Sequence, residues 1–176
     1  ISRKAGPEEN FLEEYLLKDN GAGQVSGELV RKFGKFSGKR EIEAVAVDNE
    51  LGYVYYCDEQ VGIRKYYADP AEGNQELALF GQGDFAKDNE GISIYKLTDS
   101  TGYIIVSDQG VNRFNIYPRS GNGDHQYQQI ASLPLSSGHS DGSEVTSIPL
   151  PGFPNGLFVA MSDNRTFQFY RWEDMV

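Results

Sequence analysis

The chain of 176 residues has few of the side chains that build covalent cross-links and soft-metal sites. Cys57 is its only cysteine, which excludes an intrachain disulfide and a zinc cluster of several thiolates. The two histidines, His125 and His139, stand apart in segments rich in Gly, Ser and Asp. We expect both to be loop residues rather than metal ligands.

Long apolar runs and an excess of positive charge are also missing. No run approaches the roughly 18 apolar residues that a membrane-spanning helix needs, and no signal peptide is visible, so we expect no membrane partner. The 26 acidic residues outnumber the 16 basic ones, and the net charge of -10 disfavours a nucleic-acid partner. The same charge is compatible with bound cations, and the length suits one domain with a real core.

What the sequence does contain is a repeated pattern. Three similar segments, which begin at Gly52, Gly102 and Gly156, read "GYVYYCDEQVGIRKYY", "GYIIVSDQGVNRFNIY" and "GLFVAMSDNRTFQFY". Each has a short β-rich run, an aspartate, a polar turn and a second alternating run that ends in tyrosine, which predicts a recurring β-hairpin. The glycines lie 50 and 54 residues apart. This spacing favours large propeller-type repeats, and no helical periodicity is found.

A strand that begins with glutamate is expected before each hairpin. The three strands are "EAVAVD", "EGISIY" and "EVTSIP", which start at Glu43, Glu90 and Glu144. In a four-stranded propeller blade the first strand is normally innermost, and equivalent positions on successive blades form a ring. Three carboxylates would then face one another at the channel mouth, which favours a cation that offsets their repulsion. The alternative is that each glutamate accepts backbone N–H groups of a loop.

The other β-like runs complete a coarse map of an all-β chain. We expect β-propeller blades of four antiparallel strands: the end of one blade at 1–38, two blades at 42–83 and 89–135, and an incomplete last blade at 144–176. The run "FLEEYLL" could also belong to a capped helix, but the turn-rich segment after it favours a strand. About three blades cannot close a ring. We therefore expect a missing half, on the same polypeptide or a second chain, and apolar faces at the open ends.

The chain resembles the β-propeller phytases along nearly its whole length. The motifs that carry this resemblance, in order, are "SRKAG", "GELVRKFGKF", "IEAVAVDNELGYVYYCDE", "DNEGISIY", "GYIIVSDQG", "PNGLFVAMSDN" and the terminal "RW". The resemblance implies a six-bladed propeller, of which this chain matches the second half. It also implies a secreted or periplasmic enzyme that uses Ca²⁺ to remove phosphate from inositol hexakisphosphate.

The resemblance further implies roles for particular residues. They are the catalytic and calcium-binding acids Glu43, Glu59 and Glu90, the further calcium ligands Asp88, Gln109 and Asp141, and a lysine that approaches substrate phosphate, Lys4. The chain departs from the family pattern at Ala5 and Leu135, where the family has acidic residues.

The chemistry expected of such a site is metal-assisted hydrolysis. Carboxylate oxygens suit Ca²⁺, and ions held close together can bind a phosphate and lower the pKa of an attacking water. We expect a calcium-dependent phosphomonoester hydrolase that acts on phytate or related inositol phosphates, and an isolated 1–176 fragment that is inactive. Two alternatives remain open: a calcium-dependent propeller lactonase or esterase, and a non-catalytic propeller that binds a protein or glycan.

Overall fold

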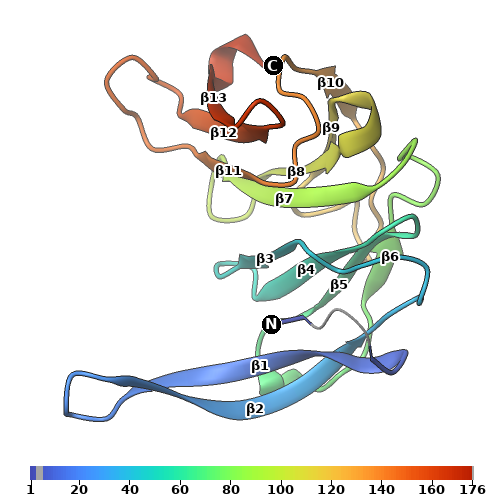
Figure 1. Ribbon diagram of the computed structural model, residues 1–176, viewed down its shortest axis with the longest axis vertical. Helices are drawn as coiled ribbons and strands as arrows, with labels where there is room; N and C mark the ends of the chain where they lie inside the picture. Colours follow the sequence, from blue (N-terminus) through green and yellow to red (C-terminus); the bar gives the residue numbers. More distant parts are fainter. Residues whose placement is uncertain (3–5, 176) are drawn as a thin grey trace.

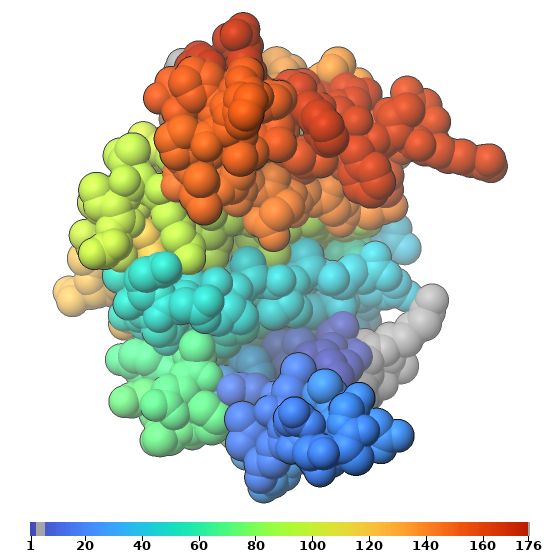
Figure 2. Space-filling view, turned by 90° about the vertical axis from the view of Figure 1, so that its left-hand side faces the viewer, coloured from blue at the N-terminus to red at the C-terminus, as the bar shows by residue number. Residues whose placement is uncertain are grey.

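A computed structural model describes residues 1–2 and 6–175. Its strands form four antiparallel sheets that follow one another in layers from the N-terminal hairpin to the C-terminal sheet (Figures 1 and 2). Within the described residues there is no α-helix, only three single turns of 3₁₀ helix. No helix in this part of the chain could cross a membrane. The predicted all-β architecture is therefore confirmed.

Each sheet is a meander of consecutive strands. The first two contain β1 (Glu9–Asp19) with β2 (Val25–Lys35), and β3 (Val45–Asp48), β4 (Tyr53–Asp58), β5 (Gly62–Tyr67) and β6 (Ala78–Phe80). The last two contain β7 (Asn89–Lys96), β8 (Gly102–Asp108), β9 (Arg113–Pro118) and β10 (Ala131–Pro134), and β11 (Ser143–Thr146), β12 (Leu157–Ser162) and β13 (Thr166–Arg171). The 3₁₀ turns are η1 (Pro70–Glu72), η2 (Gln109–Val111) and η3 (Trp172–Asp174).

Two of the three repeated glycines, Gly102 and Gly156, mark places where a side chain does not fit. Gly102 has φ +147°, and a Cβ added there would lie 2.0 Å from the carbonyl oxygen of Tyr95. At Gly156, with φ +105°, the same atom would lie 2.0 Å from the carbonyl oxygen of Thr146. Glycine lets the second strand of each of these sheets start against the end of the first.

Aromatic and aliphatic side chains fill the space between neighbouring sheets. Tyr55 and Tyr117, both fully buried, belong to the core between the second and third sheets. Tyr95 stacks on Trp172, with ring centroids 3.7 Å apart, between the third and fourth. The β1–β2 hairpin covers the other face of the second sheet, where Arg31 donates hydrogen bonds to the carbonyl oxygens of Tyr67 and Gly73. The sheets therefore pack face to face as propeller blades do.

The two ends of this stack expose apolar side chains, as expected for an incomplete ring. Phe167 and Phe169 on β13 are 71% and 62% exposed, and Leu17 and Val25 at the other end are 69% and 72% exposed. The segment "FLEEYLL" lies within strand β1, so the choice of strand over helix is confirmed. Closure of a ring, and the assignment of 1–38, 42–83, 89–135 and 144–176 to its blades, stay predictions.

Candidate metal centre

Two of the three repeated aspartates, Asp58 and Asp108, hold the loops that lead into the first strands of the second and third sheets. At the end of β4, Asp58 accepts hydrogen bonds from the backbone N–H and the hydroxyl of Ser37, at 3.0 and 2.7 Å. At the end of β8, Asp108 accepts the backbone N–H groups of Ala86 and Lys87, at 2.8 and 3.3 Å. The acidic residues follow these anchored positions in the chain, so the same local hydrogen bonding brings carboxylates to one edge of the second and third sheets.

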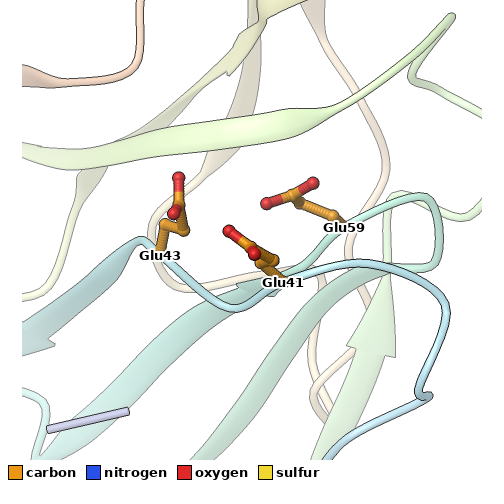
Figure 3. Close-up of side chains that lie close together, drawn as sticks. All are labelled: Glu41, Glu43 and Glu59. Carbon is orange, nitrogen blue, oxygen red and sulfur yellow. The ribbon is translucent and has the colours of Figure 1, made fainter. Parts of the chain in front are cut away.

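Two groups of three carboxylates lie at this edge. Oxygens of Glu41, Glu43 and Glu59 lie within 4.8 Å of one another, and so do oxygens of Glu59, Asp88 and Glu90. Figure 3 shows the first group, with the three carboxylates turned toward a common space. Glu59 belongs to both groups. We call these five residues the acidic cluster.

The environment of the acidic cluster disfavours negative charge. Glu59 and Glu90 are only 6% and 8% exposed. Burial, followed by the charges of Asp88, Glu43 and Glu41, raises the pKa of Glu59 to about 7. Burial and the nearby Asp141 raise the pKa of Glu90 to about 8, with Glu59 and Glu43 adding to the effect. A cation at this position would relieve both penalties.

A third loop extends the acidic cluster on the side of Glu90. Asp141, in the loop before β11, lies close enough to Glu90 to raise the pKa of that carboxyl, and it accepts a hydrogen bond from Nε2 of Gln109. Gln109 is itself placed by its backbone N–H, which donates to the carbonyl oxygen of Asp88 at 3.1 Å. The loops that precede the second, third and fourth sheets therefore all contribute an acid.

Among the described side chains, little positive charge faces Glu59, Asp88 and Glu90. Nη2 of Arg40 lies 3.5 Å from Oδ2 of Asp88, but its side chain is 55% exposed, so the pair is weak and screened by water. Nε2 of Gln60 donates to Oδ1 of Asp88 at 2.9 Å and brings no charge. Arg40 lowers the pKa of Glu59 less than the surrounding acids raise it.

The structure brings together six of the predicted site residues: Glu43, Glu59, Asp88, Glu90, Gln109 and Asp141. Their roles stay predictions. Lys4 lies outside the described residues. Glu41 was not predicted, although its place two residues before Glu43 puts both on the same side of an extended segment.

The expectation of a ring that includes Glu144 is not met. Glu144 is exposed, and its Oε1 accepts the backbone N–H of Val145 at 2.9 Å. On β11 it pairs with Val159, and it belongs to neither carboxylate group. Asp141 takes the expected position beside Glu90. Glu144 thus follows the alternative, in which the glutamate accepts a backbone N–H.

The donor set fits Ca²⁺ better than a softer metal. Within the described residues every ligand of the two groups is a carboxylate, and Cys57 is fully buried elsewhere in the core. Ca²⁺ prefers six to eight oxygen ligands in a flexible arrangement. Carboxylates supplied by separate loops can meet this preference.

The arrangement defines an all-β protein of propeller-like sheets with an acidic centre at one sheet edge. A family model described as Phytase matches residues 4–169. The chain is also 30% identical over 183 aligned residues to the "3-phytase" of Bacillus subtilis (strain 168), covering 93% of this chain and 46% of that protein. It belongs to the phytase family, and it spans about half the length of the Bacillus protein.

One solved structure supports the fold alone. The crystal structure of a DUF4623 family protein from Bacteroides eggerthii DSM 20697 is similar, with a TM-score of 0.52 at 15% identity. The match covers 84% of this chain and 34% of that one.

Proposed function

We propose that this chain is the C-terminal part of a calcium-dependent phosphomonoester hydrolase that acts on phytate or related inositol phosphates. The observation that carries the proposal is the acidic cluster, in which two buried carboxylates with raised pKa lack a matching cation among the described side chains. Membership of the phytase family supports the reaction class.

The chain's own residues would divide the work of the site. Glu43, Glu59, Asp88, Glu90 and Asp141 would hold Ca²⁺ through carboxylate oxygens, with Gln109 orienting Asp141. When bound, Ca²⁺ supplies positive charge for the phosphate and lowers the pKa of a water molecule for attack on phosphorus. From the family resemblance, Lys4 is proposed to contact a substrate phosphate.

The enzyme would need more than residues 1–176. We propose that the exposed faces beside β13 and β1–β2 are covered by further blades, from the same polypeptide or a second chain, and that the isolated segment is inactive. A secreted or periplasmic location is proposed from the family resemblance.

The deciding experiment measures phosphate release from inositol hexakisphosphate by the full-length protein, as encoded by its gene, with Ca²⁺ and with a chelator. Release that requires Ca²⁺, and a rise in melting temperature as Ca²⁺ is added, are expected. Saturation at 100 times Kd corresponds to about 2.7 kcal/mol of added stability.

Three other outcomes would contradict the proposal. Calcium-dependent hydrolysis of lactones without phosphate release would indicate a lactonase. Calcium binding with neither activity would indicate a binding module. No calorimetric signal and no shift in melting on addition of Ca²⁺ would remove the metal site itself.

A further inference from the structure

Asn89 separates two acids of the cluster, Asp88 and Glu90, at the start of β7. Its side chain is 0% exposed. Oδ1 accepts the backbone N–H of Gln60 at 3.0 Å, and Nδ2 donates to the carbonyl oxygen of Gly62 at 3.0 Å. Both polar ends of one buried amide therefore bind a single turn of the neighbouring sheet.

That turn is the one that carries Glu59. It joins β4 to β5, with Gln60 in the left-handed region at φ +60°, and its tip closes with a hydrogen bond from the N–H of Val61 to the carbonyl oxygen of Asp58 at 3.0 Å. The N–H of Gln60 has no strand partner in the β4–β5 ladder. Asn89 provides a partner for this N–H and for the carbonyl oxygen of the buried Gly62, and buried backbone groups need such partners.

The hydrogen bonds of Asn89 act against the electrostatic repulsion between acids on neighbouring sheets. Glu59 lies on one side of the boundary between the second and third sheets, and Asp88 and Glu90 lie on the other, with oxygens of all three within 4.8 Å. Like charges at this distance push the two segments apart, and burial strengthens the effect. Asn89 contains no charge, and it ties the same two segments together at the point where the acids meet.

We infer that Asn89 is a positioning residue that holds the Glu59 turn against the Asp88–Glu90 segment so that their carboxylates form one metal site. The inference rests on the proposed calcium-dependent function. Removal of a residue that orients metal ligands without touching the metal typically weakens metal binding by roughly 10- to 100-fold. A residue that only filled the core would change stability and leave the affinity of the folded protein unaltered.

A matched control exists in the same sheet as Asn89. Asn115 on β9 is 1% exposed, its Nδ2 donates to the carbonyl oxygen of Asp84 at 2.9 Å, and its Oδ1 accepts from Gln129 at 3.2 Å. It is a buried amide with the same bonding capacity, but none of its partners belongs to the acidic cluster.

The test compares Asn89→Ala with Asn115→Ala in the full-length protein, by calorimetric titration with Ca²⁺ and by urea unfolding in a chelator. We expect both variants to lose stability, and only Asn89→Ala to bind Ca²⁺ about 10- to 100-fold more weakly. Wild-type affinity in Asn89→Ala, or an equal loss in both variants, would overturn the inference. Absence of calcium binding in the wild-type protein would instead remove the proposed function.

A second variant covers the case in which Asn89→Ala does not fold. Gln60 is exposed, and its side chain provides the other link to Asp88. Gln60→Asn keeps a residue that tolerates positive φ but shortens the amide by one methylene. A several-fold loss of calcium affinity is expected, because the Glu59 turn is then held less firmly to Asp88. An unchanged affinity would show that the position of this turn does not affect the metal site, which would overturn the inference.

Discussion

Acidic side chains are buried at both ends of the β3 and β7 strands, but their pKa values shift in opposite directions at the two ends. At the far end, the fully buried Asp48 and Arg119 form two hydrogen bonds of 2.6 Å, and Glu50 pairs with Arg119 and Lys96 at 3.0 and 2.8 Å. Burial favours a higher pKa for Asp48, but the hydrogen bonds and charge of Arg119 hold it below its usual value. At the near end, Glu90 has a raised pKa.

The difference between these ends lies in charge balance rather than in burial. Two acids meet two bases at the far end, which links the second sheet to the third. In the acidic cluster, Glu59, Asp88 and Glu90 meet one half-exposed arginine among the described side chains. Buried charges are normally paired, so an unpaired group points to a ligand that completes it.

The largest effect is expected at the balanced end. Arg119→Met leaves Asp48 buried without its partner, which should cost about 3–5 kcal/mol of unfolding free energy in urea. The double variant Arg119→Met with Asp48→Leu should recover a large part of that loss because it removes both charges. A loss below about 1 kcal/mol in Arg119→Met would show that Asp48 does not depend on its partner, so that the two ends do not differ in how their charges are compensated.

A smaller effect of opposite sign is expected in the acidic cluster. In a chelator at pH 9, Glu90→Gln should leave the unfolding free energy unchanged or raise it by about 1–3 kcal/mol, because it removes a charge that burial and Asp141 disfavour. Calcium affinity should fall at the same time. Asp48→Asn is the control, since the same chemical change there should destabilise. If Glu90→Gln destabilises equally and keeps calcium binding, Glu90 is a structural residue.

The smallest effect tests a buried cation, Lys65, that forms no ion pair within residues 1–2 and 6–175. Nζ of Lys65 lies 3.6 Å from the Tyr53 ring centre and bonds to Nδ1 of His125 and the hydroxyl of Tyr127, at 2.9 and 2.7 Å. Burial lowers the Lys65 pKa to about 8 from 10.5, and Asp48 opposes this only partly.

Because the unfolded chain then holds the Lys65 proton more tightly between pH 8 and 10.5, stability should rise with pH in that window. Relative to Lys65→Met, the wild type should gain about 0.8 kcal/mol of unfolding free energy between pH 7 and 8.5. Parallel pH profiles of the two proteins would show that the contacts of Lys65 fully offset the cost of burying its charge.

The hairpins could be predicted from sequence because their causes are local. Alternating side chains reflect the two faces of a strand, and Gly102 and Gly156 reflect backbone contacts within one sheet. His125 and His139 both lie outside strands, as their Gly- and Asp-rich surroundings predicted.

The features that sequence did not predict depend on register and on contacts between sheets. The pairing of β7 with β8 is irregular between Asn89 and Ile92, whereas β11 pairs with β12 without a shift through Glu144. Two glutamates that look equivalent in sequence therefore point to different surroundings. The bonds from Asn89 to the Glu59 turn join segments about 30 residues apart, and only the packed sheets reveal them.

The meander topology has a consequence for the order in which the chain folds during synthesis. Each sheet uses consecutive strands, so its contacts are short in sequence and can form early. The acidic cluster and Asp141 draw on four separate segments between Glu41 and Asp141, so they assemble only after the second and third sheets have docked and the loop before β11 has been added. We therefore expect nascent chains that end before residue 141 to bind calcium poorly, so that the ion secures a finished fold rather than guiding its formation.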